Sequence, residues 1–304
     1  MYDLIIVGGG PAGLTAGVYA ARKRLKMALI TKEFGGQPMW TKSVENYMGF
    51  QFVSGPELMV KFDEQIRQFP IDLKYEDVVE IKREATHLEV VTNLGTYSAK
   101  TVILASGKRP KKLGVPGEEE YIGRGVAYCA TCDGPFFKGK KVAVVGSGNS
   151  AIEAVLELSE IATEVHLISR TDEHTADVVL VEKLGNLTNL TEHRLSEITQ
   201  ILGSEQVEAV EFKKLGSDEK QTIPIDGIFV EIGLDPNSQM VKSLVKLNGL
   251  EEIEVNSSSE TGIPGLFAAG DVTDGPEKQI IIAAGEGSKA ALVAYNYLLR
   301  LKDE

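Results

Sequence analysis

Two cysteines, Cys129 and Cys132, form the Cys-x-x-Cys spacing, and Asp133 follows the second of them. Zinc needs four ligands, and the four histidines of the chain are not spaced as partners, so no metal site is expected. A redox dithiol suits the spacing better, because a nearby helix N-terminus lowers a thiol pKa and the thiolate is the attacking species. Asp133 is suited to move the proton of thiol–disulfide exchange or to cap a helix. The sequence therefore predicts a catalytic dithiol.

Two glycine-rich turns flank this dithiol in the chain. The first, Gly8-Gly9-Gly10-Pro11-Ala12-Gly13, follows an apolar strand-like run, and so does the second, Gly146-Ser147-Gly148-Asn149-Ser150-Ala151. Such turns let the backbone approach a pyrophosphate, and the helix that follows offers unpaired N–H groups. Alanine at the third glycine position is a variant that the motif admits. The predicted contacts are Gly8, Gly10 and Gly13 in the first site and Gly146, Gly148 and Ala151 in the second.

The residues after the second turn leave the nucleotide's identity open. Specificity is encoded past the next strand, where an acidic residue binds a free ribose and arginine accommodates a 2′-phosphate. Arg170 suits a phosphate there, whereas Asp172 and Glu173 suit hydroxyl groups. A solvated charged loop is the alternative interpretation. The sequence therefore predicts a nicotinamide nucleotide, NADH or NADPH, with Arg170 as a candidate contact.

The hydrophobic pattern predicts alternating strands and helices on both sides of an insertion. Strands are expected at 3–7, 27–30, 141–145, 164–168 and 207–212, with a β-meander over 78–105; helices are expected at 12–24, 55–68, 151–158 and 280–301. A polar, proline-bearing stretch near 109–117 is typical of a linker. We expect an α/β fold of two Rossmann-like (three-layer ββα) dinucleotide-binding domains. The first comprises residues 1–112 and 242–304, and the second, residues 113–241, is inserted into it.

Composition narrows the class of protein. The chain has 304 residues and a formal net charge of −12. This charge argues against a nucleic-acid partner, because binding phosphates requires a basic surface. The first residues lack a basic leader and no apolar run suits a membrane span, so a cytoplasmic protein is expected. Two cysteines in one Cys-x-x-Cys suit catalysis in a reducing compartment better than structural disulfides.

In these features the chain resembles the low-molecular-weight thioredoxin reductases and the flavoprotein part of bacterial alkyl hydroperoxide reductase. The resemblance covers essentially the whole length. Its landmarks are Gly8 to Gly13, Gly35-Gly36-Gln37, Glu45-Asn46-Tyr47, Ala105-Ser106-Gly107, Cys129 to Gly134, Gly146 to Ala151, Phe267 to Val272, and Lys278-Gln279.

The resemblance implies separate roles for the two domains. It implies that FAD is held by Gly8, Gly10, Gly13, Gln37, Asn46, Asp271 and Gln279. It further implies that Cys132 faces the flavin, that Cys129 attacks the disulfide of a thioredoxin or thioredoxin-like partner, and that Asp133 is the acid/base. A homodimer and a large domain rotation are also implied.

The chain departs from this family where the donor is recognised. NADPH-using members carry a His-Arg-Arg run and a further arginine where this chain has Ser169-Arg170-Thr171 and Thr175, and the glutamate of NADH-using members is absent at Ser169. Ferredoxin as donor, a peroxiredoxin system as acceptor and, outside enzymes, a flavin redox sensor are the alternatives. The intact dithiol with Asp133 favours an enzyme over a sensor, and with the resemblance we expect an FAD-dependent thiol–disulfide oxidoreductase.

Overall fold

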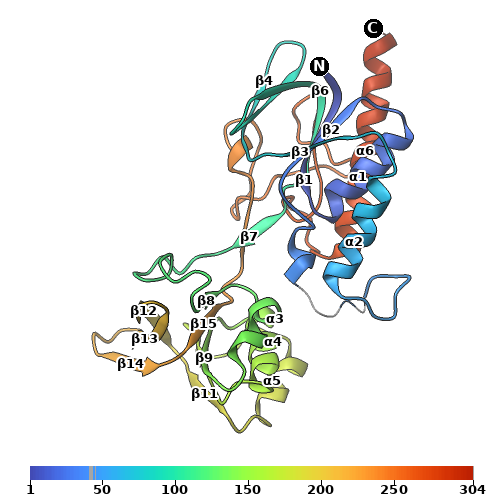
Figure 1. Ribbon diagram of the computed structural model, residues 1–304. Coiled ribbons are helices and arrows are strands. Elements are labelled where there is room, and N and C mark those ends of the chain that lie inside the picture. Colours follow the sequence, from blue (N-terminus) through green and yellow to red (C-terminus); the bar gives the residue numbers. More distant parts are fainter. Residues whose placement is uncertain (41–43, 45, 304) are drawn as a thin grey trace. The chain divides into compact units, whose positions relative to one another are not determined.

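The computed structural model in Figure 1 describes residues 1–40, 44 and 46–303. The chain divides into two units, Met1–Arg109 with Asp235–Glu304, and Pro110–Leu234. The second unit therefore begins three residues before the expected 113 and ends seven residues before the expected 241. The return is early because Asn237 donates a 2.9 Å bond to the backbone oxygen of Ser106, and Val241 is completely buried in the core of the first unit.

The first unit is built on a largely parallel sheet with the order β3-β2-β1-β6, extended by β17 on β6. The β-meander expected over 78–105 corresponds to β4, β5 and β6. In it, β4 pairs with β5 and β5 pairs with β6, both antiparallel. The strands are β1 (Tyr2–Gly9), β2 (Met27–Phe34), β3 (Asp72–Tyr75), β4 (Val78–Arg83), β5 (Leu88–Thr92), β6 (Thr96–Leu104) and β17 (Leu266–Ala268). Both ends of the chain thus contribute to one sheet.

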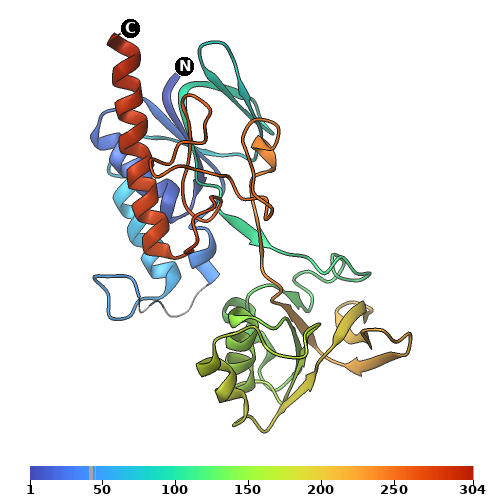
Figure 2. The same cartoon turned by 180° about the vertical axis from the view of Figure 1, so that it is seen from behind.

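Layers cover both faces of this sheet. Alternate residues of β1 point in opposite directions, so Leu4 and Ile6 pack into a core shared with helices, while Ile5 and Val7 pack against the meander side. The helices are α1 (Pro11–Arg22), α2 (Gly55–Ile66) and α6 (Ile280–Asp303). Figures 1 and 2 show them side by side on one face of the sheet.

The second unit repeats the same layering. A parallel sheet has the order β11-β10-β9-β15-β8, and a separate antiparallel sheet has the order β12-β13-β14. Val142 and Val144 of β9 face the helices, whereas Ala143 and Val145 face the antiparallel sheet. The elements are β8 (Val126–Ala127), α3 (Ala130–Asp133), β9 (Lys141–Val145), α4 (Asn149–Ser159), β10 (Glu164–Ile168), α5 (Val178–Leu184), β11 (Leu190–His193), β12 (Ser196–Gly203), β13 (Val207–Lys214), β14 (Lys220–Pro224) and β15 (Gly227–Val230). The predicted pair of three-layer α/β folds is confirmed.

Short elements complete the chain. The two crossover segments, β7 (Lys108–Pro110) and β16 (Leu234–Pro236), pair with each other. In the ranges that the structure describes, the single-turn 3-10 helices are η1 (Gln37–Trp40), η2 (Gly134–Phe137) and η3 (Gln239–Val241). None of the helices in the described ranges combines the length and apolar character that crossing a membrane requires.

Candidate functional site

The first glycine turn is shaped by close backbone contacts. Gly8 has φ +114°, and a Cβ there would lie 2.2 Å from the backbone oxygen of Ala105. A Cβ on Gly13 would lie 1.9 Å from the oxygen of Gly8. Gly10 differs, because the nearest atom to its Cβ position is the Cα of Gly36 at 3.9 Å. Gly8 and Gly13 are needed for packing, and Gly10 leaves room for a ligand.

That room lies at the N-terminus of α1. Gly10 is the N-cap of α1. Because glycine has no side chain that could cap the helix, the N–H groups of the first turn have no side-chain capping partner. Unpaired N–H groups and the helix dipole bind anions such as a pyrophosphate. The local geometry therefore fits the phosphates of a dinucleotide.

Four of the residues expected to hold FAD are brought together as two hydrogen-bonded pairs. Gln37 Nε2 donates to Asp271 Oδ2 at 3.1 Å, and Asn46 Nδ2 donates to Gln279 Oε1 at 3.0 Å. Each pair joins residues more than two hundred positions apart, and all four belong to the first unit. Glu45, which precedes Asn46 in the landmark motif, lies outside the described residues.

A buried charge cluster, which the sequence analysis did not single out, adjoins this group. Glu252 binds the ammonium groups of Lys108 at 2.8 Å and of Lys278 at 3.3 Å. Burial raises the pKa of Asp271, and the charge of Lys278 counteracts that rise. No motif marks Glu252, because it becomes significant only through lysines that are distant in the sequence.

The burial of Asp271 makes its ionised form costly in the FAD-free protein. The folded state holds the proton more tightly than the unfolded chain, so stability falls as the pH rises from the ordinary pKa through the raised folded one. Replacing Asp271 with Asn should therefore raise the Tm of FAD-free protein at neutral pH. The gain should shrink as the pH falls to the ordinary aspartate range, as differential scanning fluorimetry across pH will measure.

Asp274→Asn is the matched control, because Asp274 is exposed in the same loop. It should change the Tm little at any pH. A Tm for Asp271→Asn that is equal to or lower than that of the parent at neutral pH would contradict the assigned burial cost.

The dithiol lies in the second unit, at a short helix. Cys129 directly precedes α3, whose backbone includes Cys132; the side chain of Cys132 is outside the described part of the structure. Thr131 Oγ1 donates to Glu157 Oε2 of α4 at 2.8 Å, which ties α3 to α4.

Asp133 is the last residue of α3. Burial raises the pKa of its carboxyl, as a group that exchanges protons with thiols requires. Asp133 also occupies the N-cap position of η2, but its side chain makes no capping hydrogen bond. The capping alternative is therefore wrong, while the position beside the dithiol is compatible with the acid/base role.

The second glycine turn is equally close-packed. A Cβ on Gly146 would lie 2.2 Å from the oxygen of Glu231 and 2.8 Å from the Cβ of Ala151, which explains small residues at both turn positions. Gly148 is the N-cap of α4 and makes no side-chain capping bond. The turn thus resembles the first in offering its helix N-terminus to an anion.

Arg170 lies just after β10, in the parallel sheet of the second unit. Its side chain is 74% exposed and contacts Glu197 of β12 at 3.5 Å. The preceding Ser169 is buried and donates to the oxygen of Thr171 at 3.0 Å. A guanidinium already beside a carboxylate is a poor receptor for a phosphate, because the carboxylate repels it.

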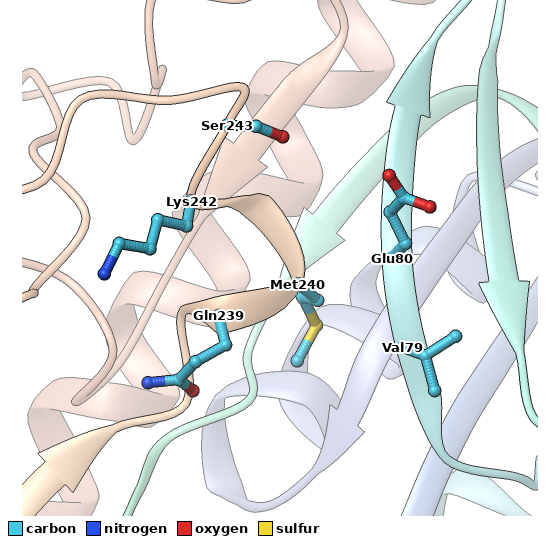
Figure 3. A pocket seen from close by; sticks show the side chains of 6 residues that line it. All are labelled: Val79, Glu80, Gln239, Met240, Lys242 and Ser243. Atoms are coloured by element: carbon cyan, nitrogen blue, oxygen red, sulfur yellow. The ribbon is translucent and has the colours of Figure 1, made fainter.

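A shallow pocket of about 600 Å³ lies elsewhere in the first unit, between β4 and η3. Figure 3 shows its lining side chains, which are Val79, Glu80, Gln239, Met240, Lys242 and Ser243. None of the residues predicted from the sequence lines this pocket.

Comparisons with known proteins agree with this geometry. Thioredoxin reductase from Lactococcus lactis has a similar structure, with a TM-score of 0.90 and 34% identity, covering 99% of this chain and 100% of that one. An alkyl hydroperoxide reductase component of Pseudomonas putida is 43% identical over 98% of this chain. A protein named NADH dehydrogenase from Bacillus subtilis is 39% identical over 98% of it. The chain spans 58% and 59% of the lengths of these last two relatives.

The family model for pyridine nucleotide-disulphide oxidoreductases matches residues 2–287. This range includes both glycine turns, the dithiol and the paired residues of the first unit. The chain therefore belongs to the pyridine nucleotide-disulphide oxidoreductase family and is a disulfide oxidoreductase enzyme.

Proposed function

We propose that this enzyme uses FAD to reduce the disulfide of a thioredoxin-like protein through Cys129 and Cys132. The observation that carries the proposal is the placement of the dithiol helix against α4, the helix of the second dinucleotide turn. The similarity to a thioredoxin reductase over the full length of both chains supports it.

The residues of the first unit provide the FAD site in this proposal. The open N-terminus of α1 at Gly10 would bind the pyrophosphate of FAD. The pairs of Gln37 with Asp271 and of Asn46 with Gln279 would hold the remaining parts of the FAD molecule. Bound FAD would take a hydride from a nicotinamide donor and deliver the electron pair to the enzyme disulfide.

The reduced dithiol then acts in two exchanges. The Cys129 thiolate attacks one sulfur of the partner disulfide, forming a mixed disulfide and releasing one partner thiolate. Cys132 attacks Cys129, which re-forms the enzyme disulfide and releases the second partner thiolate. The thiol proton of the attacking Cys132 passes through Asp133, whose pKa is raised by burial, to the second partner thiolate; the first partner sulfur leaves as the thiolate.

For the donor, NADH fits the second unit better than NADPH. Arg170 is beside Glu197, and the exposed carboxylates of Asp172 and Glu173 follow it; such carboxylates suit the hydroxyl groups of a free ribose better than a 2′-phosphate. The relative named NADH dehydrogenase supports the same choice.

The test is anaerobic stopped-flow bleaching of the flavin with NADH, NADPH or reduced ferredoxin. We expect NADH to bleach the flavin at least about tenfold faster than NADPH at equal concentration, since the missing phosphate contact is a charged one. Replacing Glu197 with Gln should free Arg170 and narrow the difference by accelerating NADPH. Faster bleaching by NADPH in the parent would refute the donor assignment, and bleaching by ferredoxin alone would refute a nicotinamide donor altogether.

A further inference from the structure

Glu252 is a buried carboxylate in the segment between η3 and β17, and its side chain is only 8% exposed. Its Oε1 lies 2.8 Å from Lys108 Nζ and 3.3 Å from Lys278 Nζ. Its Oε2 accepts a 2.7 Å bond from Asn248 Nδ2, and Asn248 Oδ1 accepts the backbone N–H of Glu252 at 3.0 Å. Both oxygens of the carboxylate are therefore held by side-chain donors.

These donors keep Glu252 ionised. Burial by itself raises the pKa of a carboxyl, but the hydrogen bonds from Lys108 and Asn248 and the charge of Lys278 hold the pKa of Glu252 below its ordinary value. A buried ion pair is stable when further hydrogen bonds satisfy its groups, as Asn248 does here. At neutral pH the carboxylate is thus a fixed anchor for two ammonium groups.

Lys278 connects this anchor to the loop that carries Asp271 and Gln279. Its ammonium also donates to the backbone oxygen of Thr273, two residues after Asp271. The backbone of Lys278 directly precedes Gln279. One side chain therefore joins Glu252 to the start of the loop, while its own backbone fixes the end.

The backbone beside Glu252 meets the same loop. The N–H of Ile253 donates to the oxygen of Val272 at 2.9 Å, and the N–H of Asp274 donates to the oxygen of Ile253 at 3.0 Å. The residues on both sides of this contact are thus neighbours of Glu252 and of Asp271. The loop 271–279 is attached to the Glu252 segment by backbone bonds and by the Lys278 ion pair.

We infer that Glu252 is a positioning residue for FAD, which acts through Lys278 on the loop 271–279. The inference rests on the proposed FAD site, in which Asp271 and Gln279 hold the cofactor. Their hydrogen-bond partners, Gln37 and Asn46, belong to a distant part of the chain. The two pairs therefore depend on how the loop is held against that part.

The two lysines of the cluster allow a test of this route. Lys278→Met removes the ammonium that reaches the loop but leaves Glu252 paired with Lys108. The Kd for FAD, measured by fluorescence titration of FAD-free protein, should rise at least about tenfold, because a charged hydrogen bond to the loop is lost. Lys108 is the first residue of β7, outside the loop, so Lys108→Met should keep a Kd near that of the parent.

Glu252→Gln should weaken FAD binding as Lys278→Met does. If both act by one route, the double variant should bind FAD about as well as Lys278→Met alone. Glu251→Gln is the matched control, because this neighbouring carboxylate is half-exposed and pairs with the exposed Lys242 at 3.0 Å. Losses that add in the double variant would overturn the inference, and so would equal losses in Lys278→Met and Lys108→Met.

Hydrogen–deuterium exchange of FAD-free protein gives a readout that needs no cofactor. The amides of Thr273 and Asp274 should exchange at least about tenfold faster in Lys278→Met and Glu252→Gln than in the parent, since the loop opens more readily. Lys278→Met provides the test if Glu252→Gln does not fold. Unchanged exchange in Lys278→Met would overturn the inference.

The two readouts also separate this inference from the proposed function. A parent protein that binds no FAD would refute the proposed function itself. A parent that binds FAD no more tightly than Lys278→Met and Glu252→Gln would overturn the positioning role alone.

Discussion

Replacement of Cys129 by serine should abolish reduction of the protein partner while the flavin is still reduced by its donor. Serine cannot form the mixed disulfide, and loss of a catalytic nucleophile lowers turnover by at least about a thousandfold. The measurement is turnover with a thioredoxin-type disulfide, followed in parallel with anaerobic bleaching of the flavin. The two readouts separate the role of Cys129 from that of the cofactor site.

Thr131→Ser is the matched control within the dithiol helix. It keeps the hydroxyl that binds Glu157, so both readouts should stay near those of the parent. Cys132→Ser should also stop partner turnover, because no disulfide can then form within the enzyme. Partner reduction that persists in Cys129→Ser would show that the electron pair leaves the enzyme by another route.

The second large effect is expected at the first glycine turn. Gly13→Ala would place a Cβ 1.9 Å from the backbone oxygen of Gly8, which no side-chain movement can relieve. Overpacking of this kind against backbone should cost more than about 3 kcal/mol, enough to unfold the first unit or leave it without FAD. Visible flavin absorbance per protein and far-UV circular dichroism will measure both losses.

Gly10→Ala distinguishes binding from folding at the same turn. Its Cβ would be 3.9 Å from the nearest atom, so the fold should remain intact. The added methyl stands where a pyrophosphate approaches α1, and FAD affinity should fall by at least about tenfold. Gly285→Ala in α6, with open space around its Cβ, is the control that should retain FAD. Full FAD affinity in Gly10→Ala would remove the proposed phosphate site.

The sequence was most informative where periodicity and glycine patterns act locally. Strands 141–145 and 164–168 have the predicted bounds, and the helix predicted at 55–68 ends at Ile66. By contrast, α5 was not predicted. It is a short helix whose Val178 and Val179 are exposed, so it lacks the one-sided apolar pattern of a surface helix.

Site residues show the same limit. The glycine turns and the dithiol are contiguous motifs and could be recognised directly. Glu252 could not, because its significance depends on burial and on lysines brought by other elements. The early return to the first unit near Asp235 depends likewise on the contact of Asn237 with Ser106, more than a hundred positions away.

The discontinuous first unit has a consequence for the order of events during synthesis. Residues 110–234 form a continuous segment, so the second unit can complete its core as soon as they leave the ribosome. The first unit cannot, since β17 pairs with β6 and α6 packs so closely on α1 that a Cβ on Gly287 would lie 2.0 Å from the oxygen of Ala12. The unit translated first therefore finishes folding last. Until β17 has been synthesised, the part of β6 that pairs with it stays unpaired while the middle of the chain folds.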